Sequence, residues 1–340
     1  MTKLILSTGN IISGGPSIIR KPGAFRSNLE LTNSLRSHFL AAKEDYLDTL
    51  DHGDGDGDGD GDVNGANGAN GAAPPLDVVV DDNNGPASAR RLPPSAWTSR
   101  ENDALYVPSI DWSGEGYGLQ EEPARYDITA KIFFLPGVPA AQRAQHARDA
   151  LSHVLRVLGA PAVDLLVVSF PGLSFEGDCE WEADRRNSVQ GSDEDEVATW
   201  AEGIEELHRA GLAKRLGVAE YGSEKLAKFL QRVQVRPAVN QVNLKNCCNV
   251  PPPLLKLAKD EGIELLVHSD CTDILPKGTL RELLGHGLGG AGLLADPETG
   301  APGLEGDLTP QWVVKYTAVV RDRGVIENKG YFAGALLHDP

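Results

Sequence analysis

Apolar and polar positions alternate with two different periods over residues 126–270. Short apolar runs predict buried strands at residues 128–134, 162–170, 212–218, 238–242 and 263–267. Between these runs, apolar residues recur every three or four positions, which is the period of an amphipathic helix. Helices are therefore expected at residues 139–159, 192–211, 223–230 and 252–260, each one following a strand.

Single residues at the ends of these segments support the boundaries. Pro139 stands where a helix would begin and Gly159 where it would end, which is the usual distribution of these two residue types. Ser192, followed by Asp195 three residues later, forms the pattern of a capping box.

The two ends of the chain carry shorter signals. Residues 5–10 predict a buried strand that ends in a polar turn, and residues 29–50 predict a helix with apolar side chains on one face. Near the carboxyl end, Thr309 as cap, Pro310 in the first turn and Gly324 beyond the last turn predict one more helix.

Repeated strand-helix units indicate a parallel α/β sheet. Their number, without a Gly-rich dinucleotide turn, favours a closed (β/α)8 barrel over an open doubly wound sheet. We expect one barrel domain over residues 1–340, with a low-complexity insertion at 51–100 and a Gly-rich loop insertion at 285–306. The Gly-Asp and Asn-Gly-Ala repeats of the first insertion offer few side chains to bury, so this segment is predicted to be disordered.

The composition excludes several classes of partner. The chain has 32 Lys and Arg against 49 Asp and Glu, a net charge of −17, so phosphate backbones and anionic lipid surfaces should repel it. No stretch approaches the roughly 20 apolar residues of a membrane-spanning helix, and the first residues lack a secretory pattern. Four cysteines do not make a disulfide framework in 340 residues. A soluble, cytoplasmic protein is expected.

Motifs for metals and phosphates are missing. The alternating Asp and Gly residues suggest a calcium loop, but the twelfth position counted from Asp54 is Gly65 and counted from Asp56 is Asn67, so the bidentate Glu is absent. The sequence contains no phosphate-binding loop, no dinucleotide turn, no His-Glu-x-x-His and no pair of Cys-x-x-Cys motifs. We therefore predict neither a metal nor a cofactor.

The successive strand segments Asp127–Phe133, Val163–Pro171, Gly211–Glu220, Pro237–Asn243 and Gly262–Ser269 resemble those of aldo-keto reductases. The resemblance implies a barrel that, in active members, reduces carbonyls with NADPH through a Tyr, a Lys, an Asp and a His. Lys131 corresponds to the lysine of that set, but Ser169 stands at the place of the histidine.

The positions that would hold the nicotinamide also differ from the family pattern. Ala219 and Glu220 replace a Ser-Asn pair that binds the nicotinamide amide, and a carboxylate cannot donate a hydrogen bond to the amide oxygen. Gln241 matches, whereas His268 replaces a stacking aromatic ring. We predict no catalytic residue and no cofactor-binding residue, and treat these six positions, Lys131 and Ser169 included, as remnants.

The missing Tyr and Asp leave one alternative open. Tyr117 and Asp111 are the nearest candidates, six residues apart where the family uses five. The alternative function is an NADPH-dependent reductase in which Lys131 and Tyr117 act on a small carbonyl.

A second resemblance covers nearly the whole chain. The stretches Leu6–Ile12, Asn240–Pro252 and Arg323–Phe332 are similar to the regulatory subunits of glutamate-cysteine ligase, a non-catalytic branch of the aldo-keto reductase barrels. This resemblance implies a heterodimer with the catalytic subunit of that ligase, tuning its glutamate affinity and its feedback inhibition by glutathione. A scaffold for a different partner is the third alternative.

Two segments are candidates for partner contact. Cys247 and Cys248 lie just past a predicted strand end, where either could form a redox-sensitive contact; the competing interpretation makes both small buried hydrophobes. Residues 324–331 are a further interface candidate.

Overall fold

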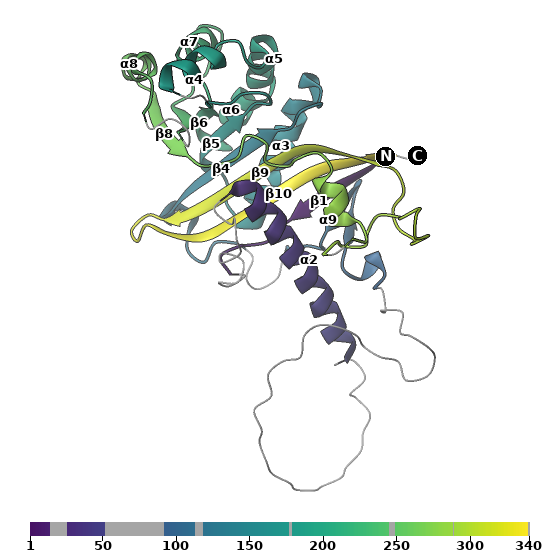
Figure 1. Ribbon diagram of the computed structural model, residues 1–340. Helices are drawn as coiled ribbons and strands as arrows, with labels where there is room; N and C mark the ends of the chain where they lie inside the picture. The colour runs from purple at the N-terminus through teal and green to yellow at the C-terminus, as the bar shows by residue number, and fades with distance from the viewer. Residues whose placement is uncertain are drawn as a thin grey trace, which may run out of the picture.

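A computed structural model describes residues 1–13, 26–51, 92–112, 118–176, 179–244, 249–287 and 289–338. Its strands form one ten-stranded sheet in the order β2-β3-β1-β10-β9-β4-β5-β6-β7-β8. Five neighbouring strands run parallel to one another, and Figure 1 shows helices gathered over this part of the sheet. These strands are β4 (Tyr126–Phe134), β5 (Val163–Ser169), β6 (Ala213–Ala219), β7 (Val239–Asn243) and β8 (Glu264–His268).

Helices connect these parallel strands. They are α3 (Ala140–Leu158), α4 (Glu180–Asn187), α5 (Asp193–Thr199), the π-helical turn η3 (Trp200–Ile204), α6 (Glu205–Arg209), α7 (Ser223–Leu230) and α8 (Pro252–Glu261). The sequence predicts all of them except α4, which forms in the polar stretch before residue 192. The predicted helix at 192–211 is continuous through α5, η3 and α6.

The predicted helix boundaries are confirmed in detail. Pro139 is the N-cap of α3, and Gly159 ends it in the left-handed conformation at φ +62°. Ser192 Oγ accepts the Asp195 N–H at 3.3 Å. The reciprocal bond comes from Glu196 rather than Asp195, because the Ser192 N–H donates to Glu196 Oε1 at 3.0 Å.

The remaining strands surround a long antiparallel hairpin and are called the antiparallel half, although β3 runs parallel to β1. β9 (Asp307–Val320) and β10 (Val325–His338) pair with each other, β9 pairs with β4, and β10 pairs with β1 (Thr2–Ser7). Two short strands, β3 (Ala104–Val107) and β2 (Ser99–Glu101), follow β1 at this edge. The other elements are α2 (Ser27–Asp51), α9 (Thr279–Leu284) and the 3-10 turns η1 (Pro94–Ala96) and η2 (Pro123–Arg125).

The predicted helix from Thr309 to Gly324 is wrong, because these residues form most of β9 and the turn after it. Their cap-like residues have other roles: Pro310 lies beside an irregularity in the β9–β10 register, and Gly324 has φ +61° at the hairpin turn. Val313 and Val314 are both fully buried, on opposite faces of the strand. A strand buried on both faces lacks the polar-apolar alternation by which a sequence pattern reveals it.

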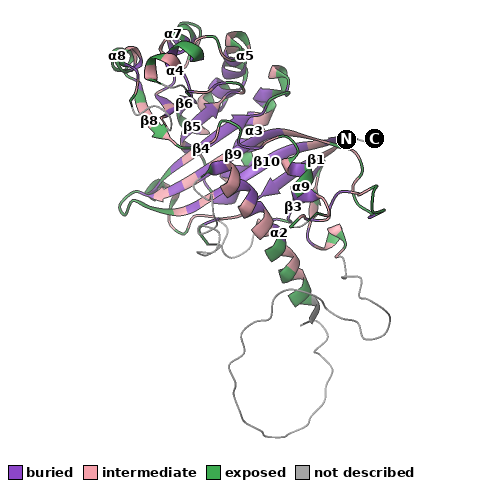
Figure 2. Cartoon of the chain, in the orientation of Figure 1, coloured by how far each residue is buried: buried purple, intermediate pink, exposed green. Residues whose placement is uncertain are grey.

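Two hydrophobic cores lie on opposite faces of the sheet. The first packs α3 and the later helices against β4–β8, with Val154, Leu166 and Trp200 fully buried. The second packs α2 and α9 against β1 and β10, with Leu35 and Tyr331 fully buried. Figure 2 shows that only the first half of α2 takes part, since the half that follows is largely exposed.

The parallel half of the sheet curls in the manner of a barrel. Four strand spacings separate β4 from β8, about 19 Å in a flat sheet. Asp270, two residues beyond β8, nevertheless places its Oδ2 atom 3.0 Å from the Lys131 Nζ atom on β4. The predicted α/β class is confirmed, and the mostly parallel sheet is consistent with the predicted (β/α)8 barrel type. The described strands do not close into a ring of eight, because the ladder ends at β2 and β8 and the antiparallel hairpin lies next to β4.

The predicted insertions need one correction. The insertion predicted at 51–100 ends earlier than expected, because η1 and β2 lie within residues 94–101 and Trp97 is buried in the second core. Residues 52–91 lie outside the described residues. The Gly-rich loop 285–306 packs onto the second core through Leu293 and Leu294. None of the helices in the described ranges has the length and apolar character needed to span a membrane.

Candidate functional site

Five of the positions predicted as remnants share one face of the curled sheet. Lys131, Ser169, Ala219, Gln241 and His268 lie on five consecutive strands. Residues beside them in sequence, such as those at 130, 168 and 218, face the first core. Since successive side chains of a strand point to opposite faces, the five side chains lie on the inner face of the curl. The structure therefore brings the predicted positions together.

Lys131 belongs to a group of three charges in which it and Asp270 are buried and Lys315 is partly exposed. It lies on β4 directly opposite Lys315 on β9. Asp270 reaches both lysines: its Oδ2 atom lies 3.0 Å from Lys131 Nζ and its Oδ1 atom lies 2.7 Å from Lys315 Nζ. The side chains of Lys131 and Asp270 are only 5% and 7% exposed. Each carboxylate oxygen thus serves one ammonium group.

The environment of this triad shifts two pKa values. Burial alone would raise the pKa of Asp270, but Lys131 and Lys315 outweigh burial and hold that pKa well below its usual range. Burial lowers the pKa of Lys131, and the charge of Asp270 opposes this change. Asp270 is therefore a carboxylate throughout the neutral pH range.

A second buried pair adjoins the triad. The Nε2 atom of His268 lies 2.5 Å from Oε1 of Glu220. The backbone N–H of Asp270 donates to His268 Nδ1 at 3.1 Å, so the ring proton lies on Nε2 and faces the carboxylate. Neither Oε1 of Glu220 nor Nε2 of His268 has a regular hydrogen bond within the described residues, so each has the other as its close polar contact.

The other carboxylate oxygen of Glu220 holds the loop that follows β5. Oε2 accepts the Phe175 N–H at 2.6 Å, and the Asn187 side-chain amide donates to the Glu220 carbonyl at 2.6 Å. Glu220 has φ +66°, a left-handed conformation that few non-glycine residues adopt. Its N–H donates to the Gln241 carbonyl at 2.7 Å. These three bonds fix the strained residue in place.

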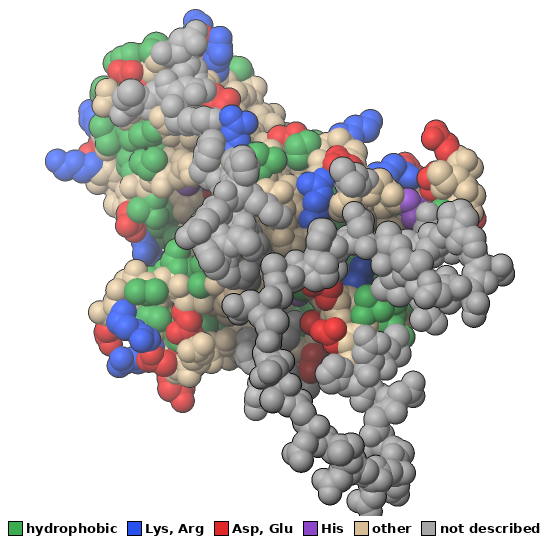
Figure 3. Space-filling view, turned by 60° about the horizontal axis from the view of Figure 1, so that its bottom comes forward, with side chains coloured by type: hydrophobic (Ala, Val, Ile, Leu, Met, Phe, Trp, Pro, Cys, Tyr) green, Lys and Arg blue, Asp and Glu red, His purple; other side chains and the backbone are tan. Residues whose placement is uncertain are grey.

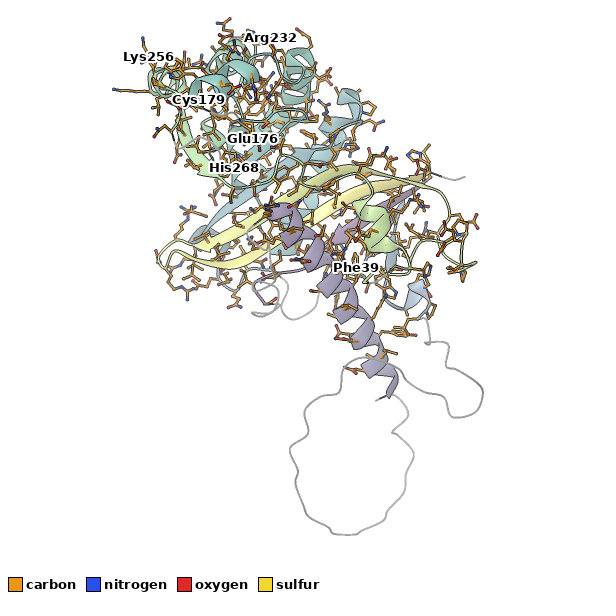
Figure 4. All side chains as sticks on the ribbon, in the orientation of Figure 1. Phe39, Glu176, Cys179, Arg232, Lys256 and His268 are labelled. Carbon is orange, nitrogen blue, oxygen red and sulfur yellow. The ribbon has the colours of Figure 1, made fainter. Side chains whose placement is uncertain are left out.

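The side chains of the cluster converge from separate elements. In Figure 4, His268 on β8 and Glu176, the neighbour of Phe175, are labelled in the same region. Sequence reasoning missed Asp270 and Lys315. Asp270 could have been found, because it is a carboxylate two residues past a predicted parallel strand, where α/β proteins place their sites. Lys315 was hidden by the wrong helix assignment.

The arrangement offers little for proton transfer or nucleophilic attack. Both lysines are paired with Asp270, and the ring proton of His268 faces Glu220. Tyr117, the candidate proton donor, lies outside the described residues, and Asp111 is exposed in the loop after β3. The bonds instead connect β4, β9, the end of β6 and the segment after β8.

The other predicted sites are the adjacent cysteines and the hairpin segment 324–331. Cys247 and Cys248 lie outside the described residues. Within the ranges that the structure covers, no three His, Cys, Asp or Glu side chains are arranged to hold a metal ion. The predicted contact segment 324–331 borders an open hollow of about 360 Å³. Val325 and Ile326 line it, and they are 56% and 39% exposed.

Hydrophobic groups are scattered over the visible surface. Figure 3 shows them as separate patches among charged side chains on the face that it presents. The most exposed large apolar side chains are those of Val189, Met1 and Val267, which lie after α4, at residue 1 and on β8. The surface in this view does not single out one large apolar interface.

Comparison with known proteins gives two kinds of match. The model of the aldo/keto reductase family matches residues 106–282. The glutamate-cysteine ligase regulatory subunit of Mus musculus is 27% identical over 216 residues, which are 63% of this chain and 68% of that protein. A putative regulatory subunit of the same ligase from Schizosaccharomyces pombe is 26% identical over 239 residues, covering 68% and 78% of the two chains. A solved Bombyx mori aldo-keto reductase in complex with NADP aligns over 38% of this chain and 37% of that one, with 23% identity and a TM-score of 0.28.

Proposed function

We propose that this chain, which belongs to the aldo/keto reductase family, is a regulatory subunit of glutamate-cysteine ligase without redox activity of its own. The mouse and fission yeast proteins that it resembles over about two thirds of its length carry that name. Their names support a regulatory role in glutathione synthesis, and the buried charge cluster supports the absence of catalysis.

The carrying observation is that the charged groups at the remnant positions are engaged within the chain itself. Lys131 is paired with Asp270, and Glu220 holds Phe175 and His268. A nicotinamide cofactor does not fit these residues. A carboxylate with one oxygen bonded to a backbone N–H and the other against an imidazole cannot donate to a carboxamide oxygen. A cofactor that displaced the partners of Lys131 and Glu220 would leave these two buried charges unpaired, which is unfavourable.

The proposed action is selective binding of one conformation of the catalytic subunit. The two chains would form a heterodimer in the cytoplasm, raising the affinity of the ligase for glutamate and weakening its inhibition by glutathione. A coupling free energy of about 1 to 3 kcal/mol between the binding sites would change these affinities roughly 5- to 150-fold. ATP and its chemistry belong to the catalytic subunit in this proposal.

The hairpin segment 324–331 is the proposed contact. Val325 and Ile326 are exposed apolar side chains at an open hollow, which is the kind of surface that an apolar side chain of a partner covers. Cys247 and Cys248 remain proposed as redox-sensitive contacts. Replacing both with Ser tests this: affinities that are equal with and without reductant, for both forms of the chain, would dispose of the redox role.

Co-purification with the ligase catalytic subunit, followed by kinetics with and without this chain, tests the proposal. We expect a lower KM for glutamate and a higher inhibition constant for glutathione in the complex. Val325→Asp should weaken the complex, whereas the matched variant Val189→Asp, at a valine that is 85% exposed elsewhere, should not. Unchanged ligase kinetics at saturating concentrations of this chain would refute the regulatory role.

The alternative function is a reductase that acts through Lys131 and Tyr117. It is favoured by one observation, a buried lysine at the family position whose pKa is lowered by burial. Fluorescence titration with NADPH and turnover of a generic aldehyde separate the two functions. Tight NADPH binding together with turnover that Lys131→Met abolishes would replace our proposal with the reductase.

A further inference from the structure

The outer edge of β8 is unusually exposed for a parallel sheet. Strands β4, β5, β6 and β7 each contain several buried residues, whereas none of the five residues of β8 is buried. Val267 is 65% exposed. Among the described strands, only β7 pairs with β8, and Figure 1 shows β8 at the margin of the helix-covered part of the molecule.

The backbone of this strand presents hydrogen-bonding groups on its outer side. The Glu264 N–H donates to the Ala238 carbonyl at 2.9 Å, toward β7. Because backbone groups alternate in direction along a strand, those of Leu266 also point to β7. Leu265 and Val267 therefore direct their N–H and C=O groups away from the sheet. An apolar strand edge of this kind takes up another extended segment.

We infer that this segment is β8 of a second copy of the chain, paired antiparallel about a two-fold axis at Leu266. The strand sequence Glu-Leu-Leu-Val-His is apolar at its three central positions, so it matches its own reverse there. Glu264 then lies opposite His268 of the second copy, Leu265 opposite Val267, and Leu266 opposite itself. The hydrogen-bonded pairs are those between Leu265 and Val267, so all outward backbone groups of both residues are satisfied.

Other registers that pair the outward groups fit less well. An axis at Leu265 places Glu264 opposite an apolar leucine. An axis at Val267 places Glu264 opposite Asp270, and like charges directly opposite one another destabilise a pair of strands. Only the axis at Leu266 places apolar residues opposite apolar residues at all three central positions without opposing two carboxylates.

The pairing also extends an apolar surface across the axis. Leu266 packs against the small apolar cluster of the inner sheet face. That cluster consists of Leu165, Val167, Ala219 and Val239, with Ala238 partly buried beside it. A two-fold contact uses the same surface of both copies, so it closes at a dimer. This inference concerns the chain alone and does not depend on the ligase.

Sedimentation velocity of the purified full chain measures the dimer directly. We expect a species of twice 36.3 kDa that dissociates on dilution. Val267→Pro removes an N–H that points away from β7, so the fold should persist while the dimer is lost. Val267→Lys, which keeps the backbone, should also give monomers. Val189→Lys is the matched control and should leave the dimer intact.

Oxidative cross-linking tests the register. Leu266→Cys places a thiol on the axis, in a close non-hydrogen-bonded pair, and should give a disulfide-linked dimer above the background of the unsubstituted chain. Val267→Cys is more exposed but lies opposite Leu265, so it should cross-link far less. The inference is overturned if the chain stays monomeric at high concentration, or if Val267→Cys cross-links better. The inference is also overturned if the chain is monomeric and Val267→Pro abolishes its binding to the ligase. The edge of β8 would then bind the ligase and not a second copy of the chain.

Discussion

The parallel and antiparallel halves of the sheet are built from different kinds of contact. In the parallel half, each strand from β4 to β8 is joined to the next by helices, so neighbours in space are neighbours in sequence. In the antiparallel half, β1 at the start of the chain pairs with β10 at its end, with Thr2 opposite Leu337. Local patterns therefore specify the first half, whereas the second depends on contacts between distant segments.

The two halves meet where β4 pairs with β9, and the charged triad lies at this junction. Lys131 and Lys315 stand directly opposite each other, and such a like-charge pair destabilises two strands. Asp270 compensates both charges from beyond β8. The position that resembles the catalytic lysine of reductases is thus part of the connection between the halves.

Removing the carboxylate at this junction should have the largest effect. Asp270→Asn leaves Lys131 buried with its charge uncompensated, which should lower the free energy of unfolding by about 3 to 5 kcal/mol. Urea denaturation measures the loss. Asp164→Asn is the control, because its partners Lys214 and Arg321 are largely exposed, and the loss there should be about 1 kcal/mol or less.

The Asp270→Asn substitution should also change how the free energy of unfolding depends on pH in acid. Because the folded pKa of Asp270 lies below its ordinary value of 3.8, its contribution is present above that pH and is lost as the pH falls further. The variant should therefore lose less stability than the original chain between pH 5 and pH 2. If the free energy of unfolding falls equally with pH in both proteins, the Asp270 carboxylate does not stabilise the contact between the two halves of the sheet.

The limits of prediction follow the same division of the molecule. Strands and helices between residues 126 and 268, apart from α4, could be predicted, because strong periodicity and residues such as Pro139 and Gly159 mark them within a few positions of the chain. β9 could not, because residues 311–314 are buried on both faces and its cap-like residues Thr309 and Pro310 imitate a helix start. The positions of β2 and β8 at the edges of the sheet could not be predicted either, because they follow from which distant strands pair, and a local pattern does not show this.

Packing within the antiparallel hairpin can be disturbed at one glycine. A methyl group at Gly330 on β10 would meet the backbone carbonyl of Gly9 and the Tyr316 hydroxyl. Gly330→Ala should therefore lower the free energy of unfolding by about 1 to 3 kcal/mol, the usual range for overpacking. Gly287→Ala, where nothing lies within 4 Å of the added methyl group, is the control and should change little. Equal melting curves for both variants would contradict the close approach.

A single cap in the parallel half should matter less. Ser192→Ala removes the acceptor for the Asp195 N–H at the start of α5, at a cost of about 1 kcal/mol. Ser152→Ala, at an exposed serine inside α3, should be neutral or slightly stabilising because alanine is the better helix former. Chemical denaturation of the two variants compares them, and a larger loss at Ser152 would argue against the capping contribution.

For the candidate site, as for the fold, local patterns predict some of the residues and not others. Its remnant positions could be predicted on one face because each lies on a periodic strand with a known direction. The partners that neutralise them could not, because Asp270 follows β8 and Lys315 lies on a misassigned strand, far from Lys131 in sequence. The structure adds to the sequence pattern that Lys131 is paired with Asp270, which also pairs with Lys315.

The smallest predicted effect concerns His153 of α3, which connects the helical layer with the hairpin. Its ring lies 6.0 Å from that of Trp312 and 5.4 Å from that of Phe332, and its Nε2 atom lies 3.2 Å from the Tyr106 hydroxyl. Burial lowers the pKa of His153, and the Asp149 carbonyl that accepts from its Nδ1 opposes this change. Since the folded pKa lies below 6.5, stability is complete above that pH and falls as the pH decreases below it.

His153→Gln keeps a polar group near Tyr106 but removes the titrating ring, so its free energy of unfolding should depend less steeply on pH between 6.5 and 5. His38 and His146, whose pKa values burial also lowers, should preserve part of the slope in the variant. Urea denaturation at several pH values measures both slopes. If the slopes are equal, protonation of His153 does not oppose packing of α3 on the hairpin, and the pH dependence belongs to His38 on α2 and His146 instead.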